Sequence, residues 1–456
     1  MVSGSERLES TVASRDLDVT QTKIVPSQRK NQPHVPCKGI ESNVNHRPFN
    51  CKGILLENSY SDNICGNGPD ACPVFGYIVD GKLNIQQLKS SLEQVIRHFP
   101  VLSARMSPNG KQLIIPEEQG DLFSWTVEEH SKPMDFTPLP STDVISINRF
   151  NSKARMDFYV PLKSTTVRRP IATNQFNPLI EVHIQVFSNK TVIGLSWNHL
   201  LTDGGGIAIL LSLWSKALKG EPMPEASINY QDPLPAHYIT NPKAPTGVVE
   251  PALFNKFRLI SSLLIDRARY GPAEPRTIFI PKWVLNEWKS ASPGEISSYN
   301  MVTAWILKGW ASAFSSGTVS IIIPLDLRKQ LPGIIPPTYM RNATSPRISP
   351  RPLKIADINK WSQLEVARVL HSFVQHFTPD VELNFHSYEF SRGGKTFRLL
   401  PEGNKGFALT SGMYFDYPKV DFGGKTESFE GYIGAGSAVG NMGTVWMEDG
   451  GARVNF

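Results

Sequence analysis

The alternation of apolar and polar positions in the centre of the chain predicts a β-hairpin followed by a helix. From 180 to 186, Ile and Val occupy every second position, and this period of two indicates a half-buried strand. The apolar run at 191–195 indicates a buried strand, and the polar residues 188–190 form the turn between the two strands. From 207 to 218 the apolar residues follow helical spacing, which predicts a helix that Gly220 and Pro222 end.

The same reasoning predicts further elements on both sides of this region. A Pro-rich stretch without periodicity, 221–251, separates two halves in which helices and strands alternate. We therefore expect an α/β protein with two domains, 73–220 and 252–456, joined by this crossover linker and preceded by a loop-rich segment, 1–72, with one strand. The predicted strands are 22–25, 74–79, 277–280 and 319–325, and the predicted helices are 88–99, 253–264, 283–288 and 301–307.

Composition and charge limit the class of protein. Of the 456 residues, 40% are hydrophobic and 19% are charged, as in soluble globular proteins. The N-terminus lacks the apolar core of a signal peptide, and no apolar run approaches the length of a membrane span, so we expect a cytoplasmic protein. The net charge of +6 suits a polyanionic small molecule as well as it suits nucleic acid, although such an excess is more often simply a solvated surface. The densest central basic pair is Arg168–Arg169, and the basic–aromatic interleaving that favours nucleic acid is not evident, so no nucleic-acid partner is expected.

All four cysteines lie between residues 37 and 72. No Cys-x-x-Cys spacing occurs, so no metal site is predicted, and reduced thiols are expected. Two of the cysteines belong to a local repeat, Cys-Lys-Gly-Ile at 37–40 and 51–54, for which the sequence gives no functional interpretation.

His199 is the main candidate for chemistry. It follows the predicted buried strand, precedes the predicted helix, and begins a His-x-x-x-Asp-Gly pattern that ends at Gly204. Imidazole has an unperturbed pKa of about 6.5, so it can accept a proton at neutral pH, and a strand end beside a turn is well placed to meet a substrate. The alternative is a hydrogen-bonded core histidine, since the chain contains ten histidines.

Two short motifs, in this order, resemble a known family. His199-Leu-Leu-Thr-Asp203-Gly204 resembles the HxxxDG signature of the BAHD family of acyl-CoA-dependent acyltransferases, and Asp421-Phe422-Gly423 resembles the start of its second signature, DFGWG. Five further stretches follow in the order of the family, at 23–27, 88–106, 302–305, 324–328 and 339–343. The resemblance covers most of the chain from about residue 74 onward, together with the short strand near Lys23. Each stretch is weak alone, and the ordered set is specific.

The resemblance implies two similar α/β domains, like those of chloramphenicol acetyltransferase, with a reaction channel between them. It implies acyl transfer from acyl-CoA, the co-substrate, to a hydroxyl or amine of a small-molecule acceptor, without a permanently bound cofactor and in a monomer. His199 would be the general base that takes the proton of the acceptor as it attacks the thioester.

The family also implies roles for other residues. Asp203 would point away from His199 and pair with Arg328, and Asp421 and Gly423 would support the structure. The glycines 204–206 would allow a tight turn and close approach of the backbone to substrate. Ser297 and Ser298, at a predicted helix N-terminus, would either receive CoA phosphates or simply cap the helix.

The chain departs from the family at two tryptophans. Gly424 replaces the Trp of DFGWG, and Gly412 replaces the Trp of a Thr-Ser-Trp stretch that helps to form the oxyanion environment. Thr410 or a backbone N–H would then have to stabilise the oxyanion.

Two alternatives stay open. Condensation domains of peptide synthetases share the expected fold, but they carry a second histidine where this chain has Asn198. A non-catalytic member that binds another acyl-processing enzyme is the other alternative, and the two glycines keep it open.

Overall fold

The structure is a computed structural model that describes residues 53–57, 72–107, 112–117, 120–139, 141–149, 152–161, 177–225, 232–245, 276–392, 405–432, 442–448 and 450–455. The predicted strand at 22–25, the predicted helix at 253–264 and the pair Arg168–Arg169 lie outside the described residues. Of the cysteines only Cys72 is described, and it is buried. Within these ranges, no helix is both long and apolar enough to cross a membrane.

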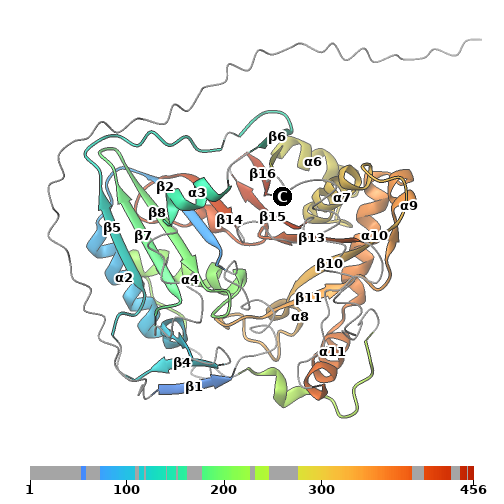
Figure 1. Cartoon of the computed structure of the whole chain (residues 1–456), viewed down its shortest axis with the longest axis horizontal. Coiled ribbons are helices and arrows are strands. Elements are labelled where there is room, and N and C mark those ends of the chain that lie inside the picture. The colour runs from blue at the N-terminus through green and yellow to red at the C-terminus, as the bar shows by residue number, and fades with distance from the viewer. Residues whose placement is uncertain are drawn as a thin grey trace, which may run out of the picture. The chain divides into compact units, whose positions relative to one another are not determined.

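The predicted hairpin lies at the centre of a five-stranded sheet with the order β14-β2-β8-β7-β5 (Figure 1). β7 and β8 pair antiparallel, which confirms the hairpin, and β8 also pairs antiparallel with β2. The strands are β2 (Val74–Asp80), β5 (Ser124–Glu129), β7 (Ile180–Val186), β8 (Lys190–Trp197) and β14 (Thr426–Tyr432).

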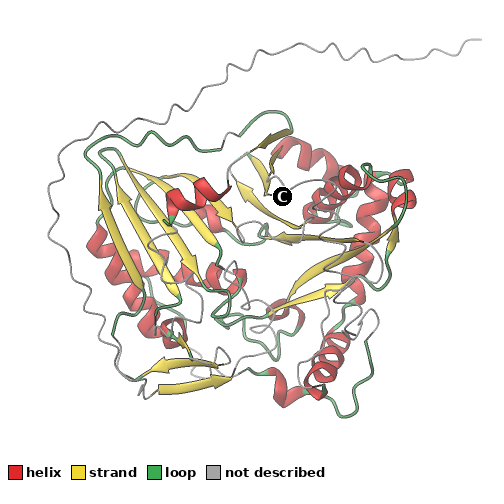
Figure 2. Cartoon of the chain, in the orientation of Figure 1, coloured by secondary structure: helices red, strands yellow, loops and turns green. Residues whose placement is uncertain are grey.

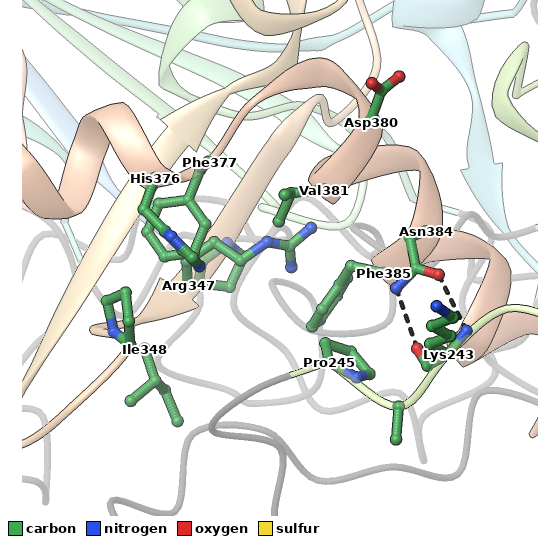
Figure 3. Close-up of a pocket in the computed structure, with 13 residues that line it drawn as sticks. Lys243, Pro245, Arg347, Ile348, His376, Phe377, Asp380, Val381, Asn384 and Phe385 are labelled. Atoms are coloured by element: carbon green, nitrogen blue, oxygen red, sulfur yellow. Dashed lines mark hydrogen bonds between the residues drawn. The ribbon is translucent and has the colours of Figure 1, made fainter.

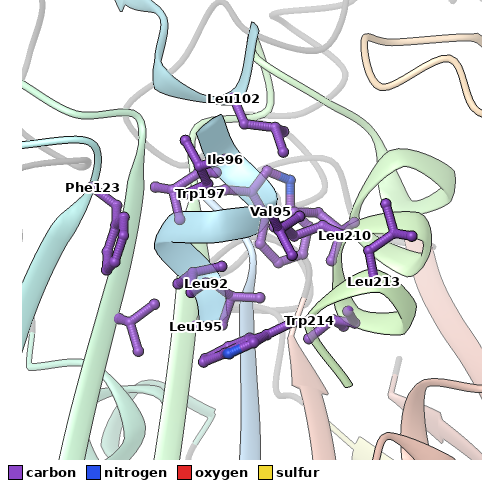
Figure 4. Packing of buried hydrophobic residues seen from close by; sticks show 14 of the residues in the cluster. Leu92, Val95, Ile96, Leu102, Phe123, Leu195, Trp197, Leu210, Leu213 and Trp214 are labelled. Atoms are coloured by element: carbon purple, nitrogen blue, oxygen red, sulfur yellow. The ribbon is translucent and has the colours of Figure 1, made fainter. Parts of the chain in front are cut away.

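Helices cover both faces of this sheet. On one face α2 (Ile85–His98) packs beside α4 (Gly204–Leu218), and the Trp214 indole N–H of α4 donates to the Leu88 carbonyl of α2 over 3.0 Å. Figure 4 shows Trp197 and Leu195 of β8 packed against side chains of both helices. The other face packs against α3 (Ser152–Tyr159). The prediction of a half-buried β7 is therefore wrong, since its polar residues Glu181 and His183 are only 1% exposed.

The close approach of α3 explains two glycines in neighbouring strands. A Cβ at Gly194 of β8 would lie 2.0 Å from the backbone oxygen of Tyr159, and a Cβ at Gly76 of β2 would lie 2.2 Å from its ring. Both positions therefore exclude larger side chains, because the neighbouring atoms could not be accommodated.

A second sheet has eight strands, with the order β11-β10-β13-β15-β16-β9-β6 and β12 paired beside β10. Helices packed on it bury a separate apolar cluster (Figure 2). The strands are β6 (Ser146–Arg149), β9 (Arg276–Pro281), β10 (Thr318–Asp326), β11 (Thr344–Ile348), β12 (Leu353–Lys354), β13 (Lys405–Ser411), β15 (Met442–Glu448) and β16 (Gly451–Asn455). The helices are α6 (Lys282–Ser290), α7 (Ser298–Ala311), α9 (Ile355–Lys360) and α10 (Gln363–His376).

The two sheets exchange strands across the domain boundary that the sequence suggested. β14 follows β13 in the chain but pairs with β2 of the five-stranded sheet, while β6 precedes the linker and pairs with β9 of the larger sheet. Local periodicity cannot reveal such an exchange, because it depends on which edges remain unpaired after the sheets assemble.

The remaining elements are a small third sheet, one further helix and several single turns. β1 (Gly53–Glu57), β4 (Gln112–Pro116) and β3 (Arg105–Met106) form a small sheet, and β1 lies in a segment for which the sequence predicted loops. The described parts of the crossover linker contain one 3-10 turn, η3 (Leu234–His237), which packs beside α11 (Pro379–Ser391). Single turns occur at η1 (Pro100–Ser103), α8 (Leu327–Gln330) and η4 (Tyr417–Lys419).

Candidate functional site

His199 lies in the turn between β8 and α4, as predicted from the sequence. Hydrogen bonds within the turn fix its path. The Trp197 indole N–H donates to the Thr202 carbonyl (3.1 Å), and the Leu200 N–H donates to the Asn198 side-chain oxygen (2.9 Å). These hydrogen bonds hold the backbone of the turn that carries the half-buried imidazole.

Asn342 orients the imidazole. Its side-chain nitrogen donates to the backbone oxygens of His199 (2.8 Å) and Leu200 (3.1 Å), which directs its side-chain oxygen toward His199 Nδ1 at 3.2 Å. An amide oxygen only accepts hydrogen bonds, so Nδ1 must carry the proton. In the neutral ring the lone pair then lies on Nε2, which makes Nε2 the atom that can accept a proton. The sequence placed Asn342 in a family-like stretch but gave no signal for this role.

Asp203 forms a buried ion pair with Arg328. The two guanidinium nitrogens Nη2 and Nη1 donate to its two carboxylate oxygens over 2.9 and 3.2 Å. The same carboxylate accepts from the Gly206 N–H (2.8 Å), the Ala343 N–H (2.7 Å) and the Thr344 hydroxyl (2.9 Å). The pairing that the resemblance implied is present, and it joins the start of α4 to the segment 339–344.

Arg328 also donates hydrogen bonds to residues other than Asp203. Its remaining N–H groups donate to the backbone oxygens of Tyr339 and Arg341 and to the Asp326 carboxylate. Burial alone would raise the pKa of Asp203, but the charge and hydrogen bonds of Arg328 outweigh burial and lower the pKa below its usual value. Burial lowers the pKa of Arg328, but the carboxylates of Asp203 and Asp326 more than compensate and raise it.

The three glycines after Asp203 form the first turn of α4, with the Asp203 carboxylate as its N-cap. The prediction of a tight turn at Gly204 is therefore wrong, because helical backbone begins there. Close approach of this backbone to a substrate stays a prediction, and protein atoms surround the two neighbouring glycines. A Cβ at Gly205 would lie 2.7 Å from Arg328 Nη1, and a Cβ at Gly206 would lie 2.6 Å from the Met340 backbone oxygen.

Tyr417 also holds the start of α4, and sequence analysis missed it. Its buried hydroxyl donates to the Gly204 carbonyl over 2.7 Å. Burial, and next the charge of Asp203, raise the pKa of Tyr417 well above its usual value, so the phenol stays protonated and can donate. Nothing in the local sequence distinguishes this tyrosine from an ordinary loop residue.

The Asp-Phe-Gly stretch contacts the opposite end of α4. The half-exposed Asp421 carboxylate accepts from the Gly423 N–H (2.8 Å) and pairs with Lys219 at the C-cap of α4 (3.0 Å). The Gly423 hydrogen bond, and next Lys219, lower the pKa of Asp421. Phe422 packs against Trp214, with 5.0 Å between ring centroids, and Gly423 has a φ of +90°, which favours glycine.

Close packing at Gly424 and Gly412 leaves no room for the two tryptophans of the family. A Cβ at Gly424 would lie 2.9 Å from Val79 Cγ1 and 3.0 Å from the Asp80 backbone oxygen. A Cβ at Gly412 would lie 3.2 Å from the Tyr417 ring and 3.3 Å from the Val445 backbone oxygen. Tightly packed atoms thus surround both positions, so an indole would require them to move.

Among the described residues, no hydrogen bond joins the other predicted site residues to the His199 turn. Thr410 lies on β13, opposite Thr444 of β15, and no hydrogen bond between described residues joins it to His199. Ser297 is the N-cap of α7 and accepts from the Asn300 N–H over 3.2 Å, while Ser298 is the first residue of that helix. In the part of the chain that the structure describes, no group of three or more His, Cys, Asp or Glu side chains could hold a metal ion.

Comparison with known proteins supports the resemblance. The solved structure of TRI101 from F. sporotrichioides, complexed with coenzyme A and T-2, matches with a TM-score of 0.65 over 88% of this chain and 94% of that one, at 14% identity. Vinorine synthase matches with a TM-score of 0.60 over 90% of each chain, at 15% identity. The chain has the fold of the BAHD acyltransferases.

Named relatives of this divergent BAHD-fold chain are acetyltransferases. It is 21% identical to acetyltransferase pyiB of Pyricularia grisea over 71% of its own length and 69% of the relative. It is 27% identical to acetyltransferase adrJ of Penicillium roqueforti over 55% of its length, and this match spans only 57% of the relative. No protein-family model matches the chain.

Proposed function

We propose that this chain transfers an acyl group from acyl-CoA to a hydroxyl group of a small-molecule acceptor, with His199 as the general base. The observation that carries the proposal is the contact between His199 Nδ1 and the Asn342 side-chain oxygen. It assigns the Nδ1 proton and leaves Nε2 as the proton acceptor, which is the form that a general base requires.

The reaction needs one proton carrier. Nε2 removes the acceptor hydroxyl proton while that oxygen attacks the thioester carbonyl carbon. The tetrahedral intermediate then expels CoA as a thiolate, which takes the proton back from the imidazolium and leaves as the thiol. No acyl-enzyme forms, because the base acts on the acceptor directly. Thr410 or a backbone N–H remains the predicted donor to the oxyanion.

The chemistry of relatives guides the choice of substrates. Two named relatives are acetyltransferases, so acetyl-CoA is the first donor to test. A hydroxyl is the first acceptor to test, since it needs a base at neutral pH more than a free amine does, and amines form the second set. Binding of CoA phosphates at the start of α7, beside Ser297 and Ser298, stays the alternative to the ordinary helix cap that Ser297 forms there. A monomeric state and a cytoplasmic location also remain predictions.

The test is acceptor-dependent release of CoA thiol by purified wild-type protein and the variant His199→Ala. The panel combines acetyl-, propionyl- and malonyl-CoA with pooled small alcohols, phenols and amines. We expect acceptor-dependent release that falls by about 10²-fold or more in the variant, as general base catalysis contributes about 10²–10⁴-fold. A matched control is His237→Ala, because His237 is exposed in the linker and should leave the rate unchanged.

Two results would contradict the proposal. Equal release by wild type and His199→Ala would show that His199 is not the general base. Absence of release with every donor, in a protein that binds CoA in equilibrium dialysis, would instead favour a non-catalytic protein that binds an acyl-processing partner.

A further inference from the structure

The described part of the crossover linker supplies one buried side chain. Leu234, in the turn η3, is 4% exposed, whereas residues 235–237 after it are exposed. The Asp232 carboxylate accepts the Leu234 N–H over 3.0 Å, and Pro233 and Pro235 each fix one backbone angle beside it. These features restrain the backbone that carries Leu234.

Leu234 completes an apolar cluster that the segment 327–343 otherwise forms. The buried members from that segment are Leu327, Leu331, Ile335, Tyr339 and Ala343. Leu327 directly precedes Arg328, and Ala343 directly follows Asn342. The linker therefore shares a core with the chain neighbours of the two residues that hold Asp203 and His199.

α11 holds this part of the linker in place. Its Leu383 packs against the same apolar cluster. The Ser387 hydroxyl accepts the Ile239 N–H over 2.9 Å. The Asn384 side chain accepts from the Lys243 N–H and donates to the Lys243 carbonyl, both over 2.9 Å (Figure 3). Three hydrogen bonds thus attach the linker to one face of α11.

The same helix is attached to β11 by two buried side-chain pairs. Arg347 donates from Nε and Nη2 to the two oxygens of Glu382 over 2.9 and 2.5 Å, and the Ser345 hydroxyl lies 3.2 Å from His386 Nε2. Glu382 and His386 are one helical turn apart, and Ser345 and Arg347 share one face of the strand, so the two pairs fix the register of helix and strand. α11 therefore connects the linker to the strand that begins two residues after Asn342.

The contact between Asn342 and His199 tolerates little displacement. His199 Nδ1 and the Asn342 side-chain oxygen are 3.2 Å apart, at the long end of the normal range for a hydrogen bond. A shift of the Asn342 segment by about 0.4 Å would break the contact, since about 3.6 Å is too long for a hydrogen bond. A loss of packing in the apolar cluster would therefore affect the imidazole.

We propose that the crossover linker positions the general base, because Leu234 packs the segment 327–343 into the place where Asn342 reaches His199 Nδ1. This inference rests on the role proposed for His199. Leu234 is a positioning residue, which acts through the apolar cluster and Asn342.

Truncation of Leu234 tests the proposal in the full chain. Leu234→Ala leaves a cavity into which the segment 327–343 can relax, so kcat should fall by about 10-fold while KM for the acyl donor changes by less than about 2-fold. The matched control is Leu370→Ala, since Leu370 is 3% exposed in the separate cluster of the larger sheet. It should lose stability in urea unfolding as Leu234→Ala does, without the fall in kcat. Leu234→Met, which keeps the volume, should recover most of the rate. If Leu234→Ala does not fold, Leu234→Val gives the same comparison with a smaller cavity.

A second measurement observes the imidazole directly and needs no turnover. NMR of protein with isotope-labelled histidine distinguishes a protonated from an unprotonated ring nitrogen, and His199→Ala identifies the His199 signals. At about pH 8.5, where the ring is neutral, the wild type should carry its proton on Nδ1. Leu234→Ala should shift both nitrogen signals toward a mixture of the two tautomers, and Leu370→Ala should not.

The two measurements separate failure of this inference from failure of the proposed reaction. An unchanged tautomer in Leu234→Ala, or an equal fall in kcat in Leu370→Ala, overturns the positioning role of Leu234. Wild-type protein that shows no turnover, but whose His199 tautomer shifts in Leu234→Ala alone, contradicts the reaction and supports the positioning role.

Discussion

Replacement of Asn342 by alanine tests how the tertiary structure prepares His199. Asn342 is 3% exposed and makes three hydrogen bonds to the His199 turn, one to the imidazole and two to backbone oxygens. Alanine removes all three and leaves both carbonyls without this partner. The Nδ1 proton would no longer be specified, so the ring could present a proton instead of a lone pair at Nε2.

The hydrogen bonds of Asn342 set the expected loss of stability and the expected loss of kcat. Each hydrogen bond contributes about 0.5–1.5 kcal/mol net, so the free energy of unfolding should fall by about 2–4 kcal/mol. Complete loss of the base costs about 10²–10⁴-fold in rate, and misorientation is a smaller perturbation than loss, so kcat should fall by about 10–10²-fold. KM for the acyl donor should change little, because these contacts of Asn342 go to the His199 turn.

The assay is a double-mutant cycle on kcat, with stability measured in parallel by urea unfolding. If Asn342 acts through His199, Asn342→Ala in the His199→Ala background should lower kcat by no more than about 2-fold further. The loss of stability should persist in both backgrounds, because two of the three hydrogen bonds go to backbone oxygens. Additive losses of kcat in the double variant would refute the orienting role.

Asn342→Asp gives a signature that a merely structural role would not produce. A carboxylate beside Nδ1 favours the protonated imidazole, and the base works only when neutral. The acid limb of the pH profile of kcat/KM should therefore move to higher pH, by about one unit. An unchanged profile, with only a lower plateau, would show that the residue does not control the ring.

Three further predictions concern the Asp203–Arg328 ion pair and the packing around Gly424. Arg328→Met should destabilise the protein by about 3–5 kcal/mol in urea unfolding, because it leaves a buried carboxylate unpaired; the double variant Asp203→Leu/Arg328→Met should lose less. Because folding lowers the pKa of Asp203, its contribution to stability is present above about pH 4 and is lost as pH falls through the lower folded pKa, so Asp203→Asn should flatten the acid side of the stability curve. Restoring the family residue with Gly424→Trp should cost at least about 1–3 kcal/mol and should not raise kcat, since even a Cβ there is 2.9 Å from Val79; a faster and equally stable variant would contradict this packing argument.

The sequence by itself determined the secondary structure that carries the site. The period of two in β7, the apolar run of β8 and the helical spacing of α4 placed His199 at a strand end before a helix, as the structure confirms. Such patterns are legible because side chains of one element share a face at fixed spacing. The motif order likewise indicated the BAHD fold and the pairing of Asp203 with Arg328.

Only the tertiary structure decided what surrounds these elements. Glu181 and His183 are buried because elements distant in the sequence cover them. The pairings of β6 and β14, and the contact of Asn342 with His199, likewise join segments that are distant in the sequence. No local period encodes such contacts, because they depend on which faces and edges meet after assembly. The imidazole tautomer is the clearest case, since an amide 143 residues away from His199 determines which ring nitrogen can accept a proton.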